Sequence, residues 1–108
     1  MKIVYTNTAH QDLRAIYDYI ALSLLSPDAA RNISEKIMKT VRSLEFLPER
    51  NPLYREEPWH SQGVRFIPVQ KYLVFYTINT VNNTVSVVRI MYGARDLSRQ
   101  LEETTEWE

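Results

Sequence analysis

Residues 64–97 read VRFIPVQKYLVFYTINTVNNTVSVVRIMYGARDL and decide the fold of this 108-residue chain. Residues 72–78 (YLVFYTI) are apolar or aromatic at nearly every position, which predicts a strand covered on both faces. The polar, Asn-rich residues 79–84 predict a hairpin turn, because Asn tolerates the positive φ that tight turns need. Residues 85–92 are rich in β-branched side chains and predict the next strand. Its alternation is expected to place Val85, Val87, Arg89 and Met91 on one side, and Ser86, Val88, Ile90 and Tyr92 on the other.

A sheet this apolar needs cover on at least one face, and the N-terminal half supplies it. Residues 2–6 predict a short strand, followed by Asn7 or Thr8 as the cap of a helix. Apolar residues three and four positions apart predict that helix. They are Ala9, Leu13, Ile16, Tyr17, Ile20 and Leu24. The polar residues His10, Gln11, Asp12, Arg14 and Asp18 are assigned to the opposite side.

A second helix is predicted to begin at Ser26-Pro27-Asp28, with Ser as the cap, Pro at the first helical position and an acid in the first turn. Its apolar stripe consists of Ala30, Ile33, Ile37, Val41 and Leu44, and it is expected to end before Pro48. Two antiparallel amphipathic helices joined by a tight turn form a hairpin that can cover one face of the sheet.

The segment 48–63 contains three prolines and no periodicity, so we expect an ordered loop held to the body by Leu53, Tyr54 and Trp59. After Asp96, Leu97 and Leu101 suggest a last short helix before an acidic tail from about residue 102. The predicted architecture is α+β in the order β-α-α-β-β-β. The helices pack on one face of a mostly antiparallel, twisted sheet, within a single domain over residues 1–108.

Composition indicates an ordinary globular protein, with 44% hydrophobic and 24% charged residues. The chain has no cysteine, which excludes disulfides and thiol chemistry, and no signal peptide or membrane-spanning run, so we expect a cytoplasmic protein. The net charge is zero, yet residues 96–108 hold five acids and a single Arg99. The remaining body is therefore basic, with 12 Lys and Arg against 8 Asp and Glu, and suits an acidic partner.

The candidate site is built from arginines in or beside the sheet, since the sequence carries no enzyme signature, metal-ligand cluster or cofactor motif. The shared polar surface is expected to include Arg65, Lys71, Tyr72, Arg89, Tyr92 and Arg95. Arginine offers planar donors for phosphate or carboxylate. The alternative is that Arg89 or Arg95 pairs internally, with Asp96 or Glu45. His10 and His60 are interpreted as surface or packing residues rather than bases, and Trp59 as a loop anchor rather than a base-stacking residue.

Several weak motifs, in order, cover nearly the whole chain. They are A-x-x-D-L-x-x-I-x-x-Y-I (9–20), P-x-x-A (27–30), L-x-x-x-P (44–48), G-V-R (63–65), Y-L-V-F-Y (72–76) and R-I-x-Y-G-A-R-D (89–96). With this set the chain resembles the RelE/ParE superfamily of toxins from type II toxin–antitoxin modules, and more closely its ParE branch. The resemblance implies a cognate antitoxin whose C-terminal segment wraps the helical hairpin and the sheet.

The resemblance implies one of two targets. RelE-like members cut mRNA on the ribosome with basic residues on the sheet and a C-terminal tyrosine or histidine. Here Leu73 stands where they commonly carry an arginine, and the C-terminal tyrosine is missing. Only Arg95, with Arg65 or Lys71 as approximate substitutes, gives a basic match, and no residue is an obvious proton carrier. ParE-like members lack this set and poison DNA gyrase, which is the function that the resemblance favours.

Two alternatives stay open. One is a ribonuclease of RelE type that uses Arg65, Arg89 and Arg95. The other is an inactive remnant that only binds antitoxin. None of the three hypotheses calls for a metal or a small-molecule cofactor.

Overall fold

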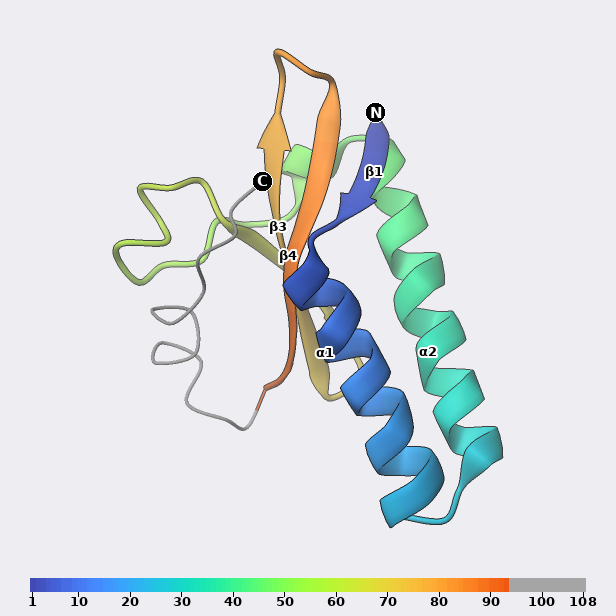
Figure 1. Ribbon diagram of the computed structural model, residues 1–108. Helices are drawn as coiled ribbons and strands as arrows, with labels where there is room; N and C mark the ends of the chain where they lie inside the picture. The colour runs from blue at the N-terminus through green and yellow to red at the C-terminus, as the bar shows by residue number, and fades with distance from the viewer. Residues whose placement is uncertain (94–108) are drawn as a thin grey trace.

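The computed structural model describes residues 1–93, and their elements follow the predicted β-α-α-β-β-β order (Figure 1). The N-terminal half contains β1 (Lys2–Tyr5), α1 (Asn7–Asp18), the π-helical turn η1 (Tyr19–Ser23), α2 (Pro27–Arg42) and the 3₁₀ turn η2 (Ser43–Glu45). The second half contains the 3₁₀ turn η3 (Pro48–Arg50) and the strands β2 (Arg65–Val69), β3 (Tyr72–Asn79) and β4 (Thr84–Tyr92). The predicted α+β fold class is confirmed. The predicted last helix and the acidic tail lie outside the described residues.

Within these residues the strands form one four-stranded sheet in the order β1-β4-β3-β2. The pairs β2–β3 and β3–β4 are antiparallel hairpins, while β1 pairs with β4 in parallel, with Lys2 opposite Thr84. The turn between β3 and β4 has Asn83 at φ 53°, as the Asn-rich sequence predicted. The mostly antiparallel sheet is thus confirmed, with β3 and β4 at its centre.

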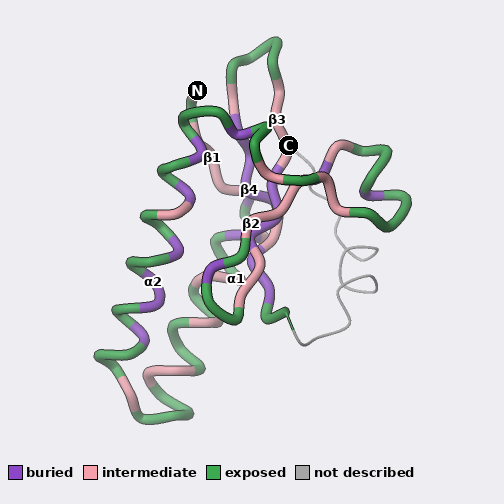
Figure 2. The backbone as a smooth tube through the Cα atoms, turned by 180° about the vertical axis from the view of Figure 1, so that it is seen from behind, coloured by how far each residue is buried: buried purple, intermediate pink, exposed green. Residues whose placement is uncertain are grey.

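Both helices pack on one face of the sheet (Figure 1), and their predicted apolar stripes form most of this contact. Buried positions recur along α2, as Figure 2 shows. The core on this side is aliphatic and includes Ala9, Ile33, Ile37, Val41, Val74, Val87 and Ile90. Tyr17 and Leu24 are exceptions to the predicted stripe of α1, because they are 38% and 54% exposed. No helix in the described part of the chain is long and apolar enough to cross a membrane.

The opposite face of the sheet is covered by the irregular segment 48–63, which lies across the sheet from the helices (Figure 1). Trp59 is only 1% exposed and belongs to a cluster with Phe75 and Val88. The ring of Tyr54 meets those of Trp59, Phe66 and Phe75 edge-on, at centroid distances of 6.0, 5.9 and 5.5 Å. The predicted anchoring of this segment is confirmed, and the sheet is covered on both faces.

The two helices begin close to their predicted starts, but the capping differs in detail. Thr6, rather than Asn7 or Thr8, caps α1, because its Oγ1 accepts a hydrogen bond from the Ala9 N–H at 3.1 Å. Ser26 does precede Pro27 at the start of α2, yet its hydroxyl makes no cap bond and donates to the Leu24 carbonyl at 3.2 Å. Pro27 carries no N–H that would need a partner, and Asp28 places a negative charge near the positive end of the helix.

The predicted alternation along β4 is wrong, because a β-bulge interrupts it. Phe75 lies opposite Arg89 whereas the next residue, Tyr76, lies opposite Val87, so Val88 is an extra residue in β4. An extra residue reverses the facing of everything beyond it. Val87 and Ile90 consequently both face the helices, and Val88 and Met91 both face the aromatic cluster.

Candidate functional site

A groove of about 720 Å³ runs between α1 with its π-turn η1 and the last residues of β4. It opens where β1 stops, because β1 pairs only with Thr84 to Val87. The end of β4 therefore has β3 on one side and no strand on the other. The lining residues are Asp12, Ala15, Ile16, Tyr19, Ile20, Leu24, Lys71, Tyr72, Arg89, Ile90, Met91 and Tyr92. Most of this lining is apolar or aromatic, which is typical of a surface that binds another molecule.

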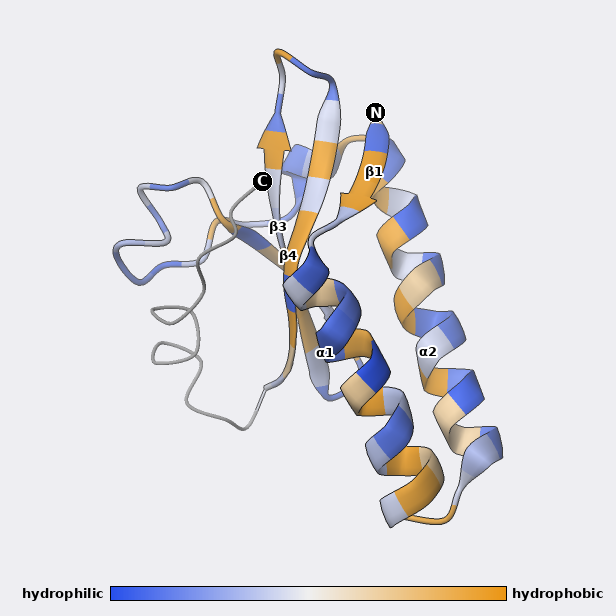
Figure 3. Cartoon of the chain, viewed as in Figure 1, coloured by the Kyte–Doolittle hydropathy of each residue, from blue (hydrophilic) through white to orange (hydrophobic). Residues whose placement is uncertain are grey.

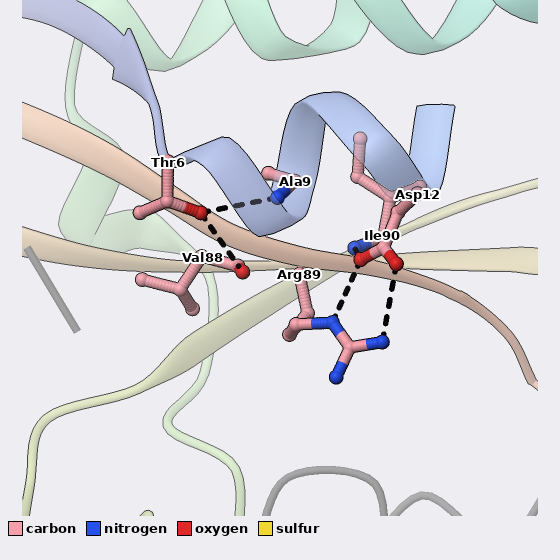
Figure 4. Close-up of polar contacts among 6 residues, drawn as sticks. All are labelled: Thr6, Ala9, Asp12, Val88, Arg89 and Ile90. Atoms are coloured by element: carbon pink, nitrogen blue, oxygen red, sulfur yellow. Dashed lines mark hydrogen bonds and ion pairs between the residues drawn. The ribbon is translucent and has the colours of Figure 1, made fainter. Parts of the chain in front are cut away.

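An ion pair joins α1 to β4 inside this groove (Figure 4). Arg89 donates from Nε to Asp12 Oδ2 at 2.7 Å and from Nη2 to Asp12 Oδ1 at 3.1 Å. Both side chains are 15% exposed, so the pair is shielded from water. The internal pairing considered for Arg89 is therefore present. Its partner among residues 1–93 is Asp12 rather than Glu45, and the alternative partner Asp96 lies outside the described residues. The sequence analysis assigned Asp12 to the polar side of α1, and this assignment is wrong because Asp12 faces β4.

The same helix closes the edge of β4 where β1 ends. Asp12 Oδ2 accepts a hydrogen bond from the Ile90 N–H at 2.9 Å. Thr6, at the junction of β1 and α1, donates from Oγ1 to the carbonyl of the bulge residue Val88 at 3.2 Å. Backbone groups at a sheet edge would otherwise be available to another strand. Here two side chains satisfy them and fix the position of α1 against β4 (Figure 4).

Tyrosines form the rim of the groove. The rings of Tyr72 and Tyr92, on neighbouring strands, meet edge-on with their centroids 5.7 Å apart. Tyr19 belongs to η1 and is 57% exposed. A π-helical turn shifts the residues after it around the helix axis, and such turns are frequent at functional sites. Exposed aromatic rings with polar tips are well suited to contacts with a partner protein.

The structure brings together four of the six predicted site residues, since Lys71, Tyr72, Arg89 and Tyr92 all line the groove. Arg65 is not among the lining residues. It lies opposite Tyr76, four residues and about 13 Å along β2 from Val69, which pairs with Tyr72. Its guanidinium donates to the carbonyls of Glu49 and Asn51 at 3.2 and 2.6 Å and so holds the start of the loop. Arg95 lies outside the described residues.

None of the residues that line the groove is a histidine, and both histidines lie elsewhere. His10 stacks on Tyr5 with ring centroids 5.1 Å apart and lines a second, shallower cleft between α1 and α2. His60 lies on the loop, with its Nδ1 3.9 Å from Glu57. Among residues 1–93, no three His, Asp or Glu side chains gather as metal ligands.

Sequence reasoning missed Asp12, although a signal was present. Asp12 follows Ala9 by three positions and precedes Ile16 by four, so it lies on the apolar stripe of α1. A lone acid on a buried stripe needs a cationic partner, and the arginines of the sheet were candidates. The contribution of Tyr19 carried no such signal, because it depends on the π-turn.

Comparisons with known proteins agree with this architecture. The model of the family described as "ParE toxin of type II toxin-antitoxin system, parDE" matches residues 3–97. A structure of the chromosomal ParDE toxin–antitoxin system from P. aeruginosa is similar, with a TM-score of 0.67 and 24% identity. The match covers 85% of this chain and 95% of that one. The RelBE2 toxin–antitoxin complex from Mycobacterium tuberculosis is similar at a TM-score of 0.57 and 20% identity, over 87% and 92% of the two chains.

A search of the curated proteins gave no significant match. The two structural similarities lie below 25% identity and bear on the fold. The family match spans most of the chain, including most of β1, both helices, strands β2 to β4 and every described residue of the groove. This chain belongs to the ParE toxin family of type II toxin–antitoxin systems.

Proposed function

We propose that this toxin arrests bacterial growth in the cytoplasm by poisoning DNA gyrase, and that a cognate antitoxin neutralises it. The observation that carries the proposal is the chemistry of the groove between α1 and β4. Its lining is apolar and aromatic, and its arginine is held by Asp12. Such a surface favours a protein that acts by binding over one that performs chemistry.

The positions of the arginines count against mRNA cleavage. Arg89 is committed to Asp12, and Arg65 to two backbone carbonyls, so neither guanidinium is held ready for a phosphate. The face of the sheet opposite the helices carries the aromatic cluster of Tyr54, Trp59, Phe66 and Phe75 instead of a basic surface. RNA cleavage needs cations at the phosphate and a group that moves the proton. The described residues support neither requirement well.

The groove also supports the proposed antitoxin partner. Both structural neighbours are toxin–antitoxin systems by their titles. Residues 1–93 carry eleven Lys and Arg (13 without Arg95 and Arg99) against eight Asp and Glu (13 without the five after residue 95). An amphipathic segment laid into an apolar groove is a common recognition mode, and acidic residues on it would complement this charge. We propose that the groove is where the antitoxin binds.

The test uses the purified chain, DNA gyrase, ATP and supercoiled plasmid, with linear DNA measured after denaturant and protease. We expect linear plasmid to accumulate with the toxin, and to disappear when the toxin is first mixed with its antitoxin. Intact plasmid with folded toxin that still arrests growth in cells would contradict gyrase as the target. Ribosome-dependent mRNA cleavage would then be measured. Absence of any growth arrest would favour the inactive remnant.

A further inference from the structure

We propose that Lys71 selects the antitoxin through a carboxylate, so that the docked segment carries an acidic residue at the end of the groove beside the β2–β3 turn. This inference rests on the proposed function, because it concerns the partner of the same groove.

The groove contains three charged side chains, and two of them neutralise each other. Arg89 and Asp12 form a two-point ion pair at 2.7 and 3.1 Å, and the Ile90 N–H adds a further bond to Asp12. Separating them would leave two charges poorly solvated, which is costly. Lys71 is the third charge. It is exposed, and its ammonium makes no hydrogen bond or ion pair with any residue from 1 to 93. A partner's carboxylate therefore finds its available cation at Lys71.

The backbone holds Lys71 firmly in place at the groove. Gln70, in the same turn, has φ 55°, and the Lys71 carbonyl accepts a hydrogen bond from the Gly93 N–H at 2.9 Å. A side chain at Gly93 would meet that carbonyl closely, since its Cβ would lie 3.3 Å from the oxygen. Lys71 thus projects from a fixed turn next to Tyr72, while its four-carbon stem can adjust to a carboxylate.

The remaining lining defines the rest of the segment. Ile16, Ile20 and Leu24 offer an aliphatic wall on the helical side, and Tyr72 and Tyr92 offer rings on the strand side. A segment with apolar residues along one face, ending in Asp or Glu near Lys71, would satisfy both features. The positive balance of residues 1–93 would also speed the encounter with an acidic segment.

The expected effects follow from an ion pair at the rim. Exposed pairs contribute modestly, so K71M, which keeps most of the apolar stem, should raise the antitoxin Kd about 2–5-fold. K71E places like charges together, so it should raise the Kd by about 10-fold or more. Salt screens this repulsion, so the increase in Kd should be larger at low salt than at high salt. The matched control is K36E, which makes the same charge change on the exposed side of α2, away from the groove.

The experiment titrates the full-length toxin with the antitoxin encoded by the adjacent gene, at about 50 and 300 mM NaCl. The second arm replaces each acidic residue of the antitoxin by Lys, one at a time. We expect one such variant to restore the binding of K71E and to weaken that of the wild type. Equal affinities for K71E and K36E, or the absence of a restoring variant, would overturn the role of Lys71. The proposed antitoxin partner would still stand in that case, provided that the wild-type toxin binds it. Failure of the wild-type toxin to bind the antitoxin would instead refute the proposed partner itself.

Discussion

The two faces of the sheet are both buried, one by regular helices and the other by an irregular loop. On one face, α1 and α2 bury an aliphatic core. Hydrophobic and hydrophilic residues alternate along both helices (Figure 3), and this periodicity is what predicts them from the sequence. On the other, the irregular segment 48–63 buries an aromatic cluster around Trp59. Both faces of the sheet are therefore covered. The groove proposed above as the antitoxin site lies beside them, between α1 and the end of β4.

The loop and the helices are expected to stabilise the sheet to a similar extent, and replacing one buried residue on each face tests this. We expect W59A to lower the free energy of unfolding by about 3–5 kcal/mol, close to the loss from I37A on the helical face. Trp59 and Ile37 are 1% and 0% exposed. Urea unfolding of both variants measures this, with V81A as the control, because Val81 is 92% exposed. A loss below about 1 kcal/mol for W59A would mean that the loop is only a cover.

Replacing Asp12 tests how much its contacts between α1 and the edge of the sheet contribute to stability. D12A should cost about 2–4 kcal/mol, since it leaves the half-buried Arg89 without its partner and the Ile90 N–H without an acceptor. D18A, which removes an exposed acid from the same helix, should cost less than about 0.5 kcal/mol. Equal unfolding midpoints for the two variants in urea would show that α1 does not need this ion pair to hold its place.

A smaller effect is expected where α1 begins. T6A removes both the cap bond to the Ala9 N–H and the bond to the Val88 carbonyl, so we expect a loss of about 1–2 kcal/mol. T6S keeps the hydroxyl and should lose less than half as much. The ratio of the two losses, from thermal or urea unfolding, tells whether the hydroxyl or the methyl group of Thr6 stabilises this junction.

The smallest effect concerns pH, and it arises on the helical side. Burial raises the pKa of Tyr76, although the hydrogen bond from Asn51 acts in the other direction. A raised pKa means that this tyrosine contributes fully below about pH 10 and that its contribution falls as pH rises further. Y76F should therefore lose stability less steeply than the wild type above about pH 10. At pH 7 it should cost about 1 kcal/mol, because the bond to the Pro48 carbonyl is lost. Parallel slopes above pH 10 would contradict this assignment.

The parts of the fold that the sequence predicted are those determined by local periodicity. The stripe of α2 from Ala30 to Leu44 is buried at every predicted position, and the hairpin from Tyr72 to Tyr92 pairs as expected. Alternation along β4 failed at Val88, because a bulge there adds one residue to the strand. The Val88 carbonyl accepts a hydrogen bond from Thr6, 82 residues away, and local periodicity carries no signal of such a distant contact.

The candidate site could be predicted in its strand residues but not in its helical ones. Lys71, Tyr72, Arg89 and Tyr92 stood out as charged or aromatic residues at the ends of apolar strands, and the structure gathers them in one groove. Asp12, the partner of Arg89, is 77 residues away in the sequence. Arg65 was included in the predicted site because the sequence does not show that it lies at the far end of β2 from the groove. The packing of α1 against β4 decided the case of Asp12, and the register of β2 against β3 decided that of Arg65.

The parallel pairing of β1 with β4 has a consequence for synthesis. Among the described strands, the one that leaves the ribosome first has as its partner the one that leaves last, with Lys2 opposite Thr84. Contacts between such distant residues form slowly, and a domain folds as a unit once its parts are present. The groove, which needs both α1 and β4, can therefore form only after synthesis has passed Tyr92. If the antitoxin binds there, as proposed, it meets its site only on a chain that already carries both halves of the sheet.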